Sequence, residues 1–155
     1  MKISDILKPE CVLADIQAMT KKDILTELSR PIAENYGVNI EEMVGVLLNR
    51  EKLGSTGIGE GVAIPHGKIG GLKSIVASIG KSREGLKFDA LDGKPCHIFF
   101  LLAAPSNSVS GNLKALARAS MLLKNQSLRA KHIKAETPGE LYRVLVEYHN
   151  KLGEH

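Results

Sequence analysis

The chain has 155 residues, of which 43% are hydrophobic and 25% charged, and this size and composition predict one globular domain with a full core. No apolar run approaches the ~20 residues that cross a bilayer, and Met1–Asp5 lacks the apolar segment of a signal peptide, so we expect a cytoplasmic protein without membrane insertion. The net charge of +4 comes from scattered basic residues, and with 4% aromatic residues and no Trp we expect no nucleic-acid partner.

The N-terminal part of the chain predicts a strand followed by a helix. Residues 11–16 form a short apolar run that is typical of a strand. Thr20 followed by Asp23 resembles a capping box and predicts the start of a helix. Pro31 lies inside the apolar pattern of this helix, and because proline removes a backbone hydrogen bond we expect the helix to bend or break just before it.

A second helix is predicted between Asn39 and Gly54. Asn39 with Glu42 is a typical start, and Gly54 is a plausible C-terminal stop. Arg50 therefore falls in the last turn of this helix, close to the most glycine-dense stretch of the chain. Within that stretch, His66 ends an apolar run, where backbone without Cβ can approach a ligand and turn its N–H groups toward an anion.

The remaining elements are two strands and two or three helices. Residues 74–80 are extended, and His97–Ala104 is a nearly continuous apolar run, as expected for a strand covered on both faces. Ser110 is the predicted cap of the next helix, a short helix is expected around 126–134, and Thr137–Glu140 is a strong helix start. This order predicts a single-domain, three-layer α/β/α sandwich with a mixed β-sheet.

The cysteines and the other histidines are expected to be structural. Cys11 and Cys96 lie beside apolar residues and have no metal spacing, which favours buried free thiols in a reducing compartment. His97 interrupts an apolar strand and is expected to be a hydrogen-bonded core or edge residue. The histidines predicted to face solvent are His132, His149 and His155.

Nucleotide, metal and serine-hydrolase sites are not favoured by the spacing. Gly67-Lys68 lacks both the glycine four residues before it and the following Ser or Thr of a P-loop. The third glycine of a dinucleotide fingerprint is missing, no Gly-x-Ser-x-Gly occurs, and His66 has no regularly spaced metal-binding partner. We therefore expect no cofactor and no metal.

The residue types around His66 suit phosphoryl chemistry. A neutral imidazole is a nucleophile at pH 7, and Pro65 fixes the backbone just before it. Arg50 supplies planar donors that match phosphate oxygens, and the helix that starts near Ser110 offers free amides. Spacing alone does not show that these groups converge, and a turn histidine with ordinary loop glycines is the alternative.

The segment from Arg50 to Gly67 closely resembles the active-site segment of the fructose/mannitol-type enzyme IIA proteins of the bacterial phosphoenolpyruvate-dependent phosphotransferase system. Leu86–Pro95 and Leu101–Pro105 also resemble this family. The opening Met1–Leu7, with Lys21-Lys22, is most similar to its nitrogen-regulatory branch. The resemblance implies one enzyme IIA type-2 domain over residues 1–155, with a core of about 3–150, and an α/β sandwich with a mixed sheet.

The resemblance also implies the site. His66 is expected to accept a phosphoryl group from a histidine-containing phosphocarrier protein, with Nε2 favoured as the attacking nitrogen, and Arg50 is expected to bind the phosphate. Ser55 and Thr56 are further candidates for contact with the phosphate or with His66. Where the family usually has a second histidine, this chain has Asn112, which can donate a hydrogen bond but cannot carry charge.

We expect the first of three functions and keep the other two as alternatives. The first is a regulatory phosphocarrier whose phosphorylation state is read by transporter or sensor proteins, with potassium transport or nitrogen and carbon metabolism as the regulated process. The second is a sugar-specific enzyme IIA that passes phosphate to an enzyme IIB. The third is a binding module that is no longer phosphorylated. For the first function, the expected docking surface is the apolar set Ile58, Val62, Ile64 and Ile69.

Overall fold

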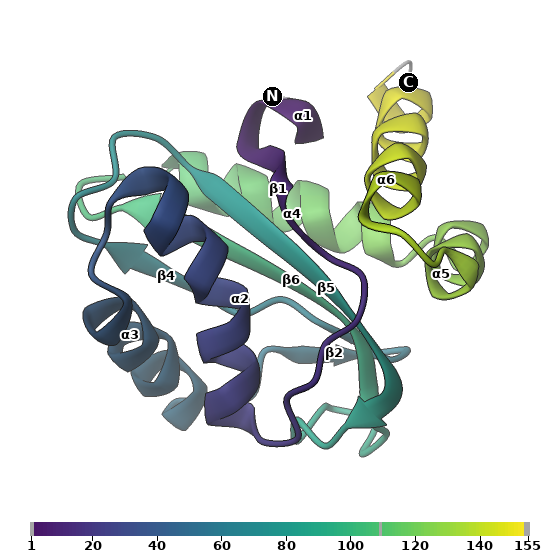
Figure 1. Ribbon diagram of the computed structural model, residues 1–155, viewed down its shortest axis with the longest axis horizontal. Helices are drawn as coiled ribbons and strands as arrows, with labels where there is room; N and C mark the ends of the chain where they lie inside the picture. Colours follow the sequence, from purple (N-terminus) through teal and green to yellow (C-terminus); the bar gives the residue numbers. More distant parts are fainter. Residues whose placement is uncertain (1, 109, 154–155) are drawn as a thin grey trace.

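The computed structural model describes residues 2–108 and 110–153, with side chains for all of these except 110–112, 152 and 153. A sheet lies between α2 and α3 on one face and α4 on the other (Figure 1). In chain order the elements are α1 (Ile3–Ile6), β1 (Leu7–Leu13), α2 (Lys21–Tyr36), α3 (Ile40–Lys52), β2 (Gly57–Gly59), β3 (Val62–Ala63), β4 (His66–Ile69), β5 (Val76–Leu86), β6 (Cys96–Pro105), α4 (Ser110–Leu123), α5 (Gln126–Lys134) and α6 (Pro138–Gly153).

The sheet is mixed and has β6 at its centre. Its order is β1-β5-β6-β3-β2, and β4 also pairs with β6. β5 runs antiparallel to β6, whereas β3 and β4 run parallel to it, and β1 is parallel to β5. Nine of the ten residues of β6 are buried, as its continuous apolar sequence predicts for a strand covered on both faces.

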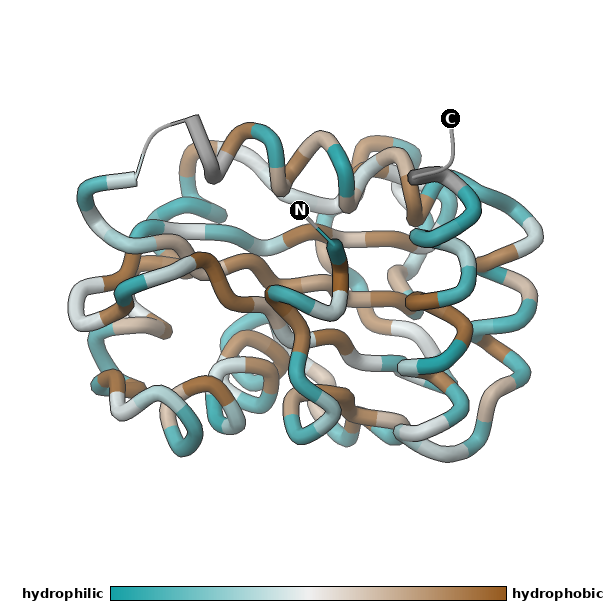
Figure 2. Tube along the Cα trace, turned by 90° about the horizontal axis from the view of Figure 1, so that it is seen from above, coloured by the Kyte–Doolittle hydropathy of each residue, from teal (hydrophilic) through white to brown (hydrophobic). Residues whose placement is uncertain are grey.

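Two layers of helices enclose this sheet, which confirms the predicted α/β/α sandwich. Figure 2 shows the strands between an upper and a lower row of helices. Leu28 on α2, Leu47 on α3 and Leu122 on α4 are fully or almost fully buried, so both layers contribute to the core. In the described ranges, no helix combines the length and the apolar character that crossing a membrane requires.

The predicted helix starts are confirmed by their caps. The Asp23 N–H donates to Thr20 Oγ1 at 3.1 Å, and the Glu42 N–H donates to the Asn39 side chain at 3.0 Å. α6 begins after Thr137, whose hydroxyl oxygen accepts from the backbone N–H of residue 140. α4 begins at Ser110 as expected, but the predicted capping contact of that side chain lies outside the described residues.

The predicted break at Pro31 is wrong, because α2 continues as one helix to Tyr36. Pro31 is buried, and its neighbours along the same face, Leu28 and Ile32, have no exposed surface. Burial of these side chains on both sides of the proline offsets the one hydrogen bond that its ring removes. The helix instead ends at Gly37, which adopts the left-handed conformation at φ 70°.

The first strand and the glycine-rich stretch also differ from the prediction. β1 covers residues 7–13 rather than 11–16, and the short helix α1 precedes it. The glycine-rich stretch contains β2, β3 and β4, which are two to four residues long. Strands this short show no period-2 pattern, and pairing decides where they form: β3 and β4 pair with β6, and β2 pairs with β3.

Two histidines that were predicted to face solvent are buried. His132 is fully buried and His149 is 4% exposed, which corrects the prediction for both, while His155 lies outside the described residues. Their helices α5 and α6 pack against each other and the sheet, so a polar sequence context did not report their burial. The expectation for His97 is confirmed, since it is half-buried and its Nδ1 lies 3.0 Å from the Ser82 carbonyl oxygen.

The two cysteines are buried free thiols, as predicted. Burial is the main cause that raises the pKa of both Cys11 and Cys96 to about 11. Both thiols therefore stay protonated and poorly nucleophilic at neutral pH.

Candidate functional site

His66 is the first residue of β4, and its ring is held at both nitrogens. Nδ1 lies 2.9 Å from the carbonyl oxygen of Ile64, and Nε2 lies 3.4 Å from Nε of Arg50. An arginine N–H can only donate, so Nε2 is the acceptor and the ring proton is on Nδ1. The geometry therefore describes a neutral imidazole whose Nε2 lone pair faces the guanidinium.

The backbone around His66 is fixed on both sides of Pro65. The Ile64 N–H donates to the Thr56 carbonyl at 3.0 Å, and the Pro65 carbonyl accepts from the Leu102 N–H at 2.9 Å. Proline has no N–H, so the ladder of β3 and β4 along β6 is interrupted at this point. His66 follows this interruption and is half-buried at the start of a paired strand.

Arg50 reaches His66 from the last turn of α3. Its Nη1 donates to the Gly54 carbonyl at 2.8 Å, which orients the guanidinium beside the imidazole. Gly54 has φ +145°, a conformation that residues with a side chain rarely adopt. The two contacts use two of the five N–H groups of a guanidinium, so donors remain for the oxygens of a phosphoryl group.

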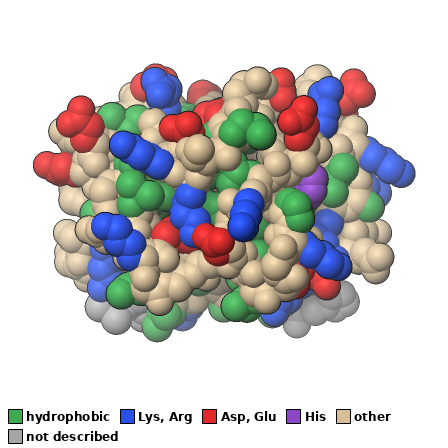
Figure 3. All heavy atoms as spheres, turned by 90° about the horizontal axis from the view of Figure 1, so that it is seen from below, with side chains coloured by type: hydrophobic (Ala, Val, Ile, Leu, Met, Phe, Trp, Pro, Cys, Tyr) green, Lys and Arg blue, Asp and Glu red, His purple; other side chains and the backbone are tan. Residues whose placement is uncertain are grey.

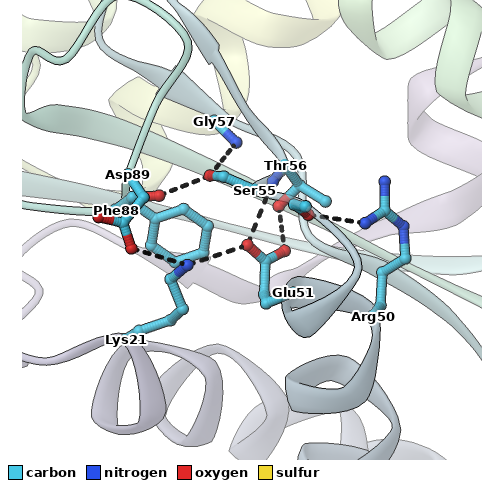
Figure 4. Close-up of polar contacts among 9 residues, drawn as sticks. Lys21, Arg50, Glu51, Ser55, Thr56, Gly57, Phe88 and Asp89 are labelled. Carbon is cyan, nitrogen blue, oxygen red and sulfur yellow. Dashed lines mark hydrogen bonds and ion pairs between the residues drawn. The ribbon is translucent and has the colours of Figure 1, made fainter.

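Ser55 and Thr56 lie next to Arg50, but their hydroxyl hydrogens are already donated within the protein. Ser55 Oγ donates to the Phe88 carbonyl at 2.5 Å, and Thr56 Oγ1 donates to the buried carboxylate of Glu51 at 2.5 Å. These bonds tie the loop at Ser55 and Thr56 to Phe88 and Glu51 (Figure 4). A phosphate contact by either hydroxyl hydrogen would require one of them to break.

Asn112 is in the first turn of α4, but its side chain lies outside the described residues. Its predicted contact with the phosphate therefore stays a prediction. Within the described part of the chain, no group of three or more His, Cys, Asp or Glu side chains is arranged to hold a metal ion.

The apolar docking surface expected at the glycine-rich stretch is wrong. Val62, Ile64 and Ile69 are at most 4% exposed and belong to the core, and Ile58 is partly buried against it. They are buried because the segment pairs with β6 rather than forming an open loop. Two exposed apolar side chains lie close to this segment. Leu53 precedes it in the chain and is 86% exposed, and Leu91, whose N–H donates to the Gly57 carbonyl, is 84% exposed.

Glu51 and Lys21 are the residues of this region that sequence reasoning missed. Glu51 follows Arg50 directly, and Lys21 Nζ lies 3.4 Å from its Oε1. The available signal was a charged residue next to Arg50 on the inward side of an amphipathic helix. On the face seen in Figure 3, basic and acidic side chains are interspersed with apolar ones, so this face carries no large patch of one sign.

Comparison with known proteins gives a consistent picture. A model of the family "Phosphoenolpyruvate-dependent sugar phosphotransferase system, EIIA 2" matches residues 5–148. A nitrogen regulatory protein of Bradyrhizobium diazoefficiens is 40% identical over 146 residues, covering 94% of this chain and 95% of the relative. The fructose-specific EIIABC component of Bacillus subtilis is 31% identical over 149 residues, which are 96% of this chain but 24% of that protein.

A solved structure is similar over nearly the same length. The crystal structure of nitrogen regulatory protein IIA-Ntr from Neisseria meningitidis has a TM-score of 0.86 and 31% sequence identity to this chain. The likeness covers 92% of this chain and 98% of that one.

Proposed function

The chain belongs to the phosphoenolpyruvate-dependent sugar phosphotransferase system EIIA 2 family, and we propose that it is a regulatory phosphocarrier. His66 accepts a phosphoryl group from a histidine-containing phosphocarrier protein, and the two charge states of the site bind different transporter or sensor proteins. The observation that carries this proposal is the contact between the Nε2 lone pair of His66 and Arg50. The similarity to nitrogen regulatory proteins over most of both chains favours the regulatory role.

In the proposed transfer, Nε2 of His66 attacks phosphorus in line. The new P–N bond forms as the bond between phosphorus and the donor ring nitrogen breaks, and that nitrogen keeps the bonding electrons. Attack leaves positive charge on the His66 ring, which the Ile64 carbonyl stabilises through the hydrogen bond from Nδ1–H. Arg50 gives up its contact with the lone pair and donates to the phosphoryl oxygens instead.

The protein needs no metal or nucleotide for this step, because the donor is itself a phosphohistidine. Asn112 is proposed to donate to the phosphoryl group from the start of α4, and Ser55 and Thr56 to hold the loop beside it. We place the exchange in the cytoplasm, since the free thiols Cys11 and Cys96 suit a reducing compartment.

The decisive experiment is phosphorylation with phosphoenolpyruvate, the general enzyme of the system and the phosphocarrier. The wild-type chain should form one phosphohistidine, detected by mass spectrometry and by its ³¹P resonance, and His66→Ala should form none. An unlabelled wild type, or full labelling of His66→Ala, contradicts the proposal. Partner binding by His66→Ala and His66→Asp then tests the binding-module alternative, which predicts equal affinity for both variants.

A second candidate is favoured by the similarity to a fructose-specific EIIABC component. In that case the phosphoryl group passes from His66 to an enzyme IIB domain. Adding a fructose-type enzyme IIB to the phosphorylated chain separates the two. Rapid loss of the His66 label to enzyme IIB favours the sugar-specific function, and retention of the label favours the regulatory one. Asn112→His, run in parallel, tests whether the second histidine governs this passage.

A further inference from the structure

The carboxylate of Glu51 is the centre of a buried polar cluster at the end of α3. The residue is 7% exposed, and its Oε1 accepts from the Thr56 N–H at 3.1 Å while Oε2 accepts from the Thr56 hydroxyl at 2.5 Å. Lys21, the first residue of α2, places Nζ 3.4 Å from Oε1 (Figure 4). A buried carboxylate is costly unless it is paired and hydrogen-bonded, and here both requirements are met.

This cluster leads directly to the imidazole of His66. Thr56, clamped by Glu51, accepts from the Ile64 N–H through its own carbonyl at 3.0 Å. The carbonyl of Ile64 in turn accepts from Nδ1 of His66 at 2.9 Å. The position of the Ile64 carbonyl therefore depends on where Thr56 is held. Because this carbonyl accepts from Nδ1, it sets the tautomer and orientation of the His66 ring.

The same carboxylate also bears on the loop that orients Arg50. Glu51 follows Arg50 in the chain, and its bond to Thr56 closes a loop of residues 51–56. The Gly54 carbonyl that orients the guanidinium lies within this loop. Anchoring Thr56 to Glu51 closes this short loop back onto the helix end. One side chain thus restrains both the donor at Nε2 and the acceptor at Nδ1.

Lys21 extends the cluster to a third segment. Its Nζ lies 3.4 Å from Oδ2 of Asp89 and 4.7 Å from the ring centroid of Phe88. The Phe88 carbonyl accepts from Ser55, so the segment next to Thr56 is tied to the same place. The ammonium offsets the negative charge of Glu51 beside a site that must receive a phosphoryl group of like sign.

We propose that Glu51, neutralised by Lys21, is a positioning residue for phosphoryl transfer that acts through Thr56. It touches neither the reacting nitrogen nor the phosphoryl group. It holds the loop so that Nδ1 keeps its proton on the Ile64 carbonyl and Nε2 faces the incoming phosphorus. This role rests on the proposed function of His66, but its effect on the ring exists before any phosphate arrives.

The test uses the full chain with Thr56→Val, Thr56→Ser and Glu51→Gln, and Glu41→Gln as control. Thr56→Val removes the hydroxyl that Glu51 holds, whereas Thr56→Ser keeps it. Glu51→Gln removes the charge facing Lys21 and keeps the size. Glu41 is an exposed carboxylate on the same helix. The ¹⁵N resonances of the His66 ring report the tautomer in the unphosphorylated protein, and rapid-quench kinetics report transfer from the phosphocarrier.

In Thr56→Val and Glu51→Gln we expect His66 ring ¹⁵N shifts that move toward a mixture of tautomers. We also expect a maximal transfer rate about 10- to 100-fold lower, the size of one lost charge-assisted hydrogen bond. KM for the phosphocarrier should stay within about twofold, because Glu51 and Thr56 are buried and cannot touch it. Thr56→Ser and Glu41→Gln should match the wild type.

A purely structural role for Glu51 predicts the opposite pattern. In that case Thr56→Val and Glu51→Gln would lower the unfolding midpoint but leave the ring ¹⁵N shifts and the maximal rate unchanged, and the proposal would be overturned. Equal loss in Thr56→Ser and Thr56→Val would also overturn it. If the wild type is not phosphorylated at all, the proposed function fails, while the ring ¹⁵N shifts still decide the positioning role.

Discussion

Arg50 contacts His66 through Nε and Gly54 through Nη1, two separate nitrogens of one rigid plane that the single nitrogen of a lysine cannot replace. We predict that Arg50→Lys slows phosphorylation of His66 about 10- to 100-fold, because the charge remains but the oriented donors are lost. Rapid-quench assays with saturating phosphocarrier measure this. Arg30→Lys, on the exposed side of α2, is the matched control and should transfer at the wild-type rate. A wild-type rate for Arg50→Lys would show that only the charge matters.

His132 gives the stability of the protein a pH dependence. The pKa of His132 is lowered to about 3, mainly by burial and secondly by the positive charge of Lys81. In the unfolded chain, His132 takes up a proton below its ordinary pKa of about 6.5, whereas in the folded chain it stays neutral until about pH 3. This contribution to stability is therefore fully present above pH 6.5 and is lost as the pH falls toward 3. Between pH 7 and 5.5 this residue should remove about 1 kcal/mol from the free energy of unfolding.

Urea denaturation at the two pH values checks this prediction. His132→Leu replaces a titrating side chain by an apolar one of similar burial, so the difference in unfolding free energy between pH 7 and 5.5 should shrink by about 1 kcal/mol. An unchanged difference in the variant would show that other groups cause the pH dependence. Neither ring nitrogen of His132 has a hydrogen-bond partner among the described residues, so protonation of the folded state gains nothing to offset it.

At the level of elements, β5 passes close to its neighbours at Gly80. A Cβ added there would lie 2.3 and 2.9 Å from atoms of Ile16 and 3.2 Å from Leu28 of α2. We predict that Gly80→Ala lowers the free energy of unfolding by about 1–3 kcal/mol, since this core has no room for another methyl group. Gly45→Ala, in the middle of α3 with no atom of the described residues within 4 Å of the new Cβ, should instead raise it by about 0.5–1 kcal/mol.

The two alanine variants are compared by urea denaturation at one pH. Backbone entropy favours alanine over glycine in both positions. If the two variants change the free energy of unfolding in opposite directions, the loss in Gly80→Ala is therefore due to packing. Stabilisation of Gly80→Ala would mean that Ile16 moves aside at little cost.

The elements that the sequence predicted well are those with local signals. Caps at Thr20, Asn39 and Thr137 are formed within three residues, so the helix starts could be predicted without knowledge of the fold. The short strands β3 and β4 have no such signal, because their backbone partners lie more than 30 residues away in β6, and β2 forms only by pairing with β3. Pro31 was misjudged for the same reason, since tertiary burial of α2 outweighs a local rule.

In the candidate site, too, the sequence indicated some residues and only the structure revealed others. The residue types at His66 and Arg50 indicated phosphoryl chemistry, but only the family resemblance placed them together, and the structure then gave their 3.4 Å contact. Glu51 was missed because its importance depends on Thr56 and Lys21, which approach it through the loop and α2. Burial of His132 and His149 was likewise a property of helix packing that a polar neighbourhood concealed.

For the whole molecule, the sheet bears on the proposed phosphorylation of His66, which would change a surface without refolding it. His66 starts a strand whose four residues are all registered on β6, from Leu102 to Pro105, and β6 is the buried centre of the sheet. The backbone beneath the phosphoryl group is thus part of the core. Under the proposed function, the change that partners would detect is therefore electrostatic and confined to the surface near Arg50 and the loop beside it.

We therefore predict that phosphorylation changes the charge of the molecule but not its size. The formal net charge of +4 should fall to about +2 to +2.5, since a phosphoryl group adds about −1.5 to −2 at neutral pH. Isoelectric focusing should show a shift below the sequence value of about 9.1, absent in His66→Ala. The radius of gyration from X-ray scattering should stay the same in both forms. The reason is that β4, paired along the central strand of a covered sheet, cannot move without opening the core. A larger or smaller particle after phosphorylation would contradict this and would mean that the molecule assembles or rearranges.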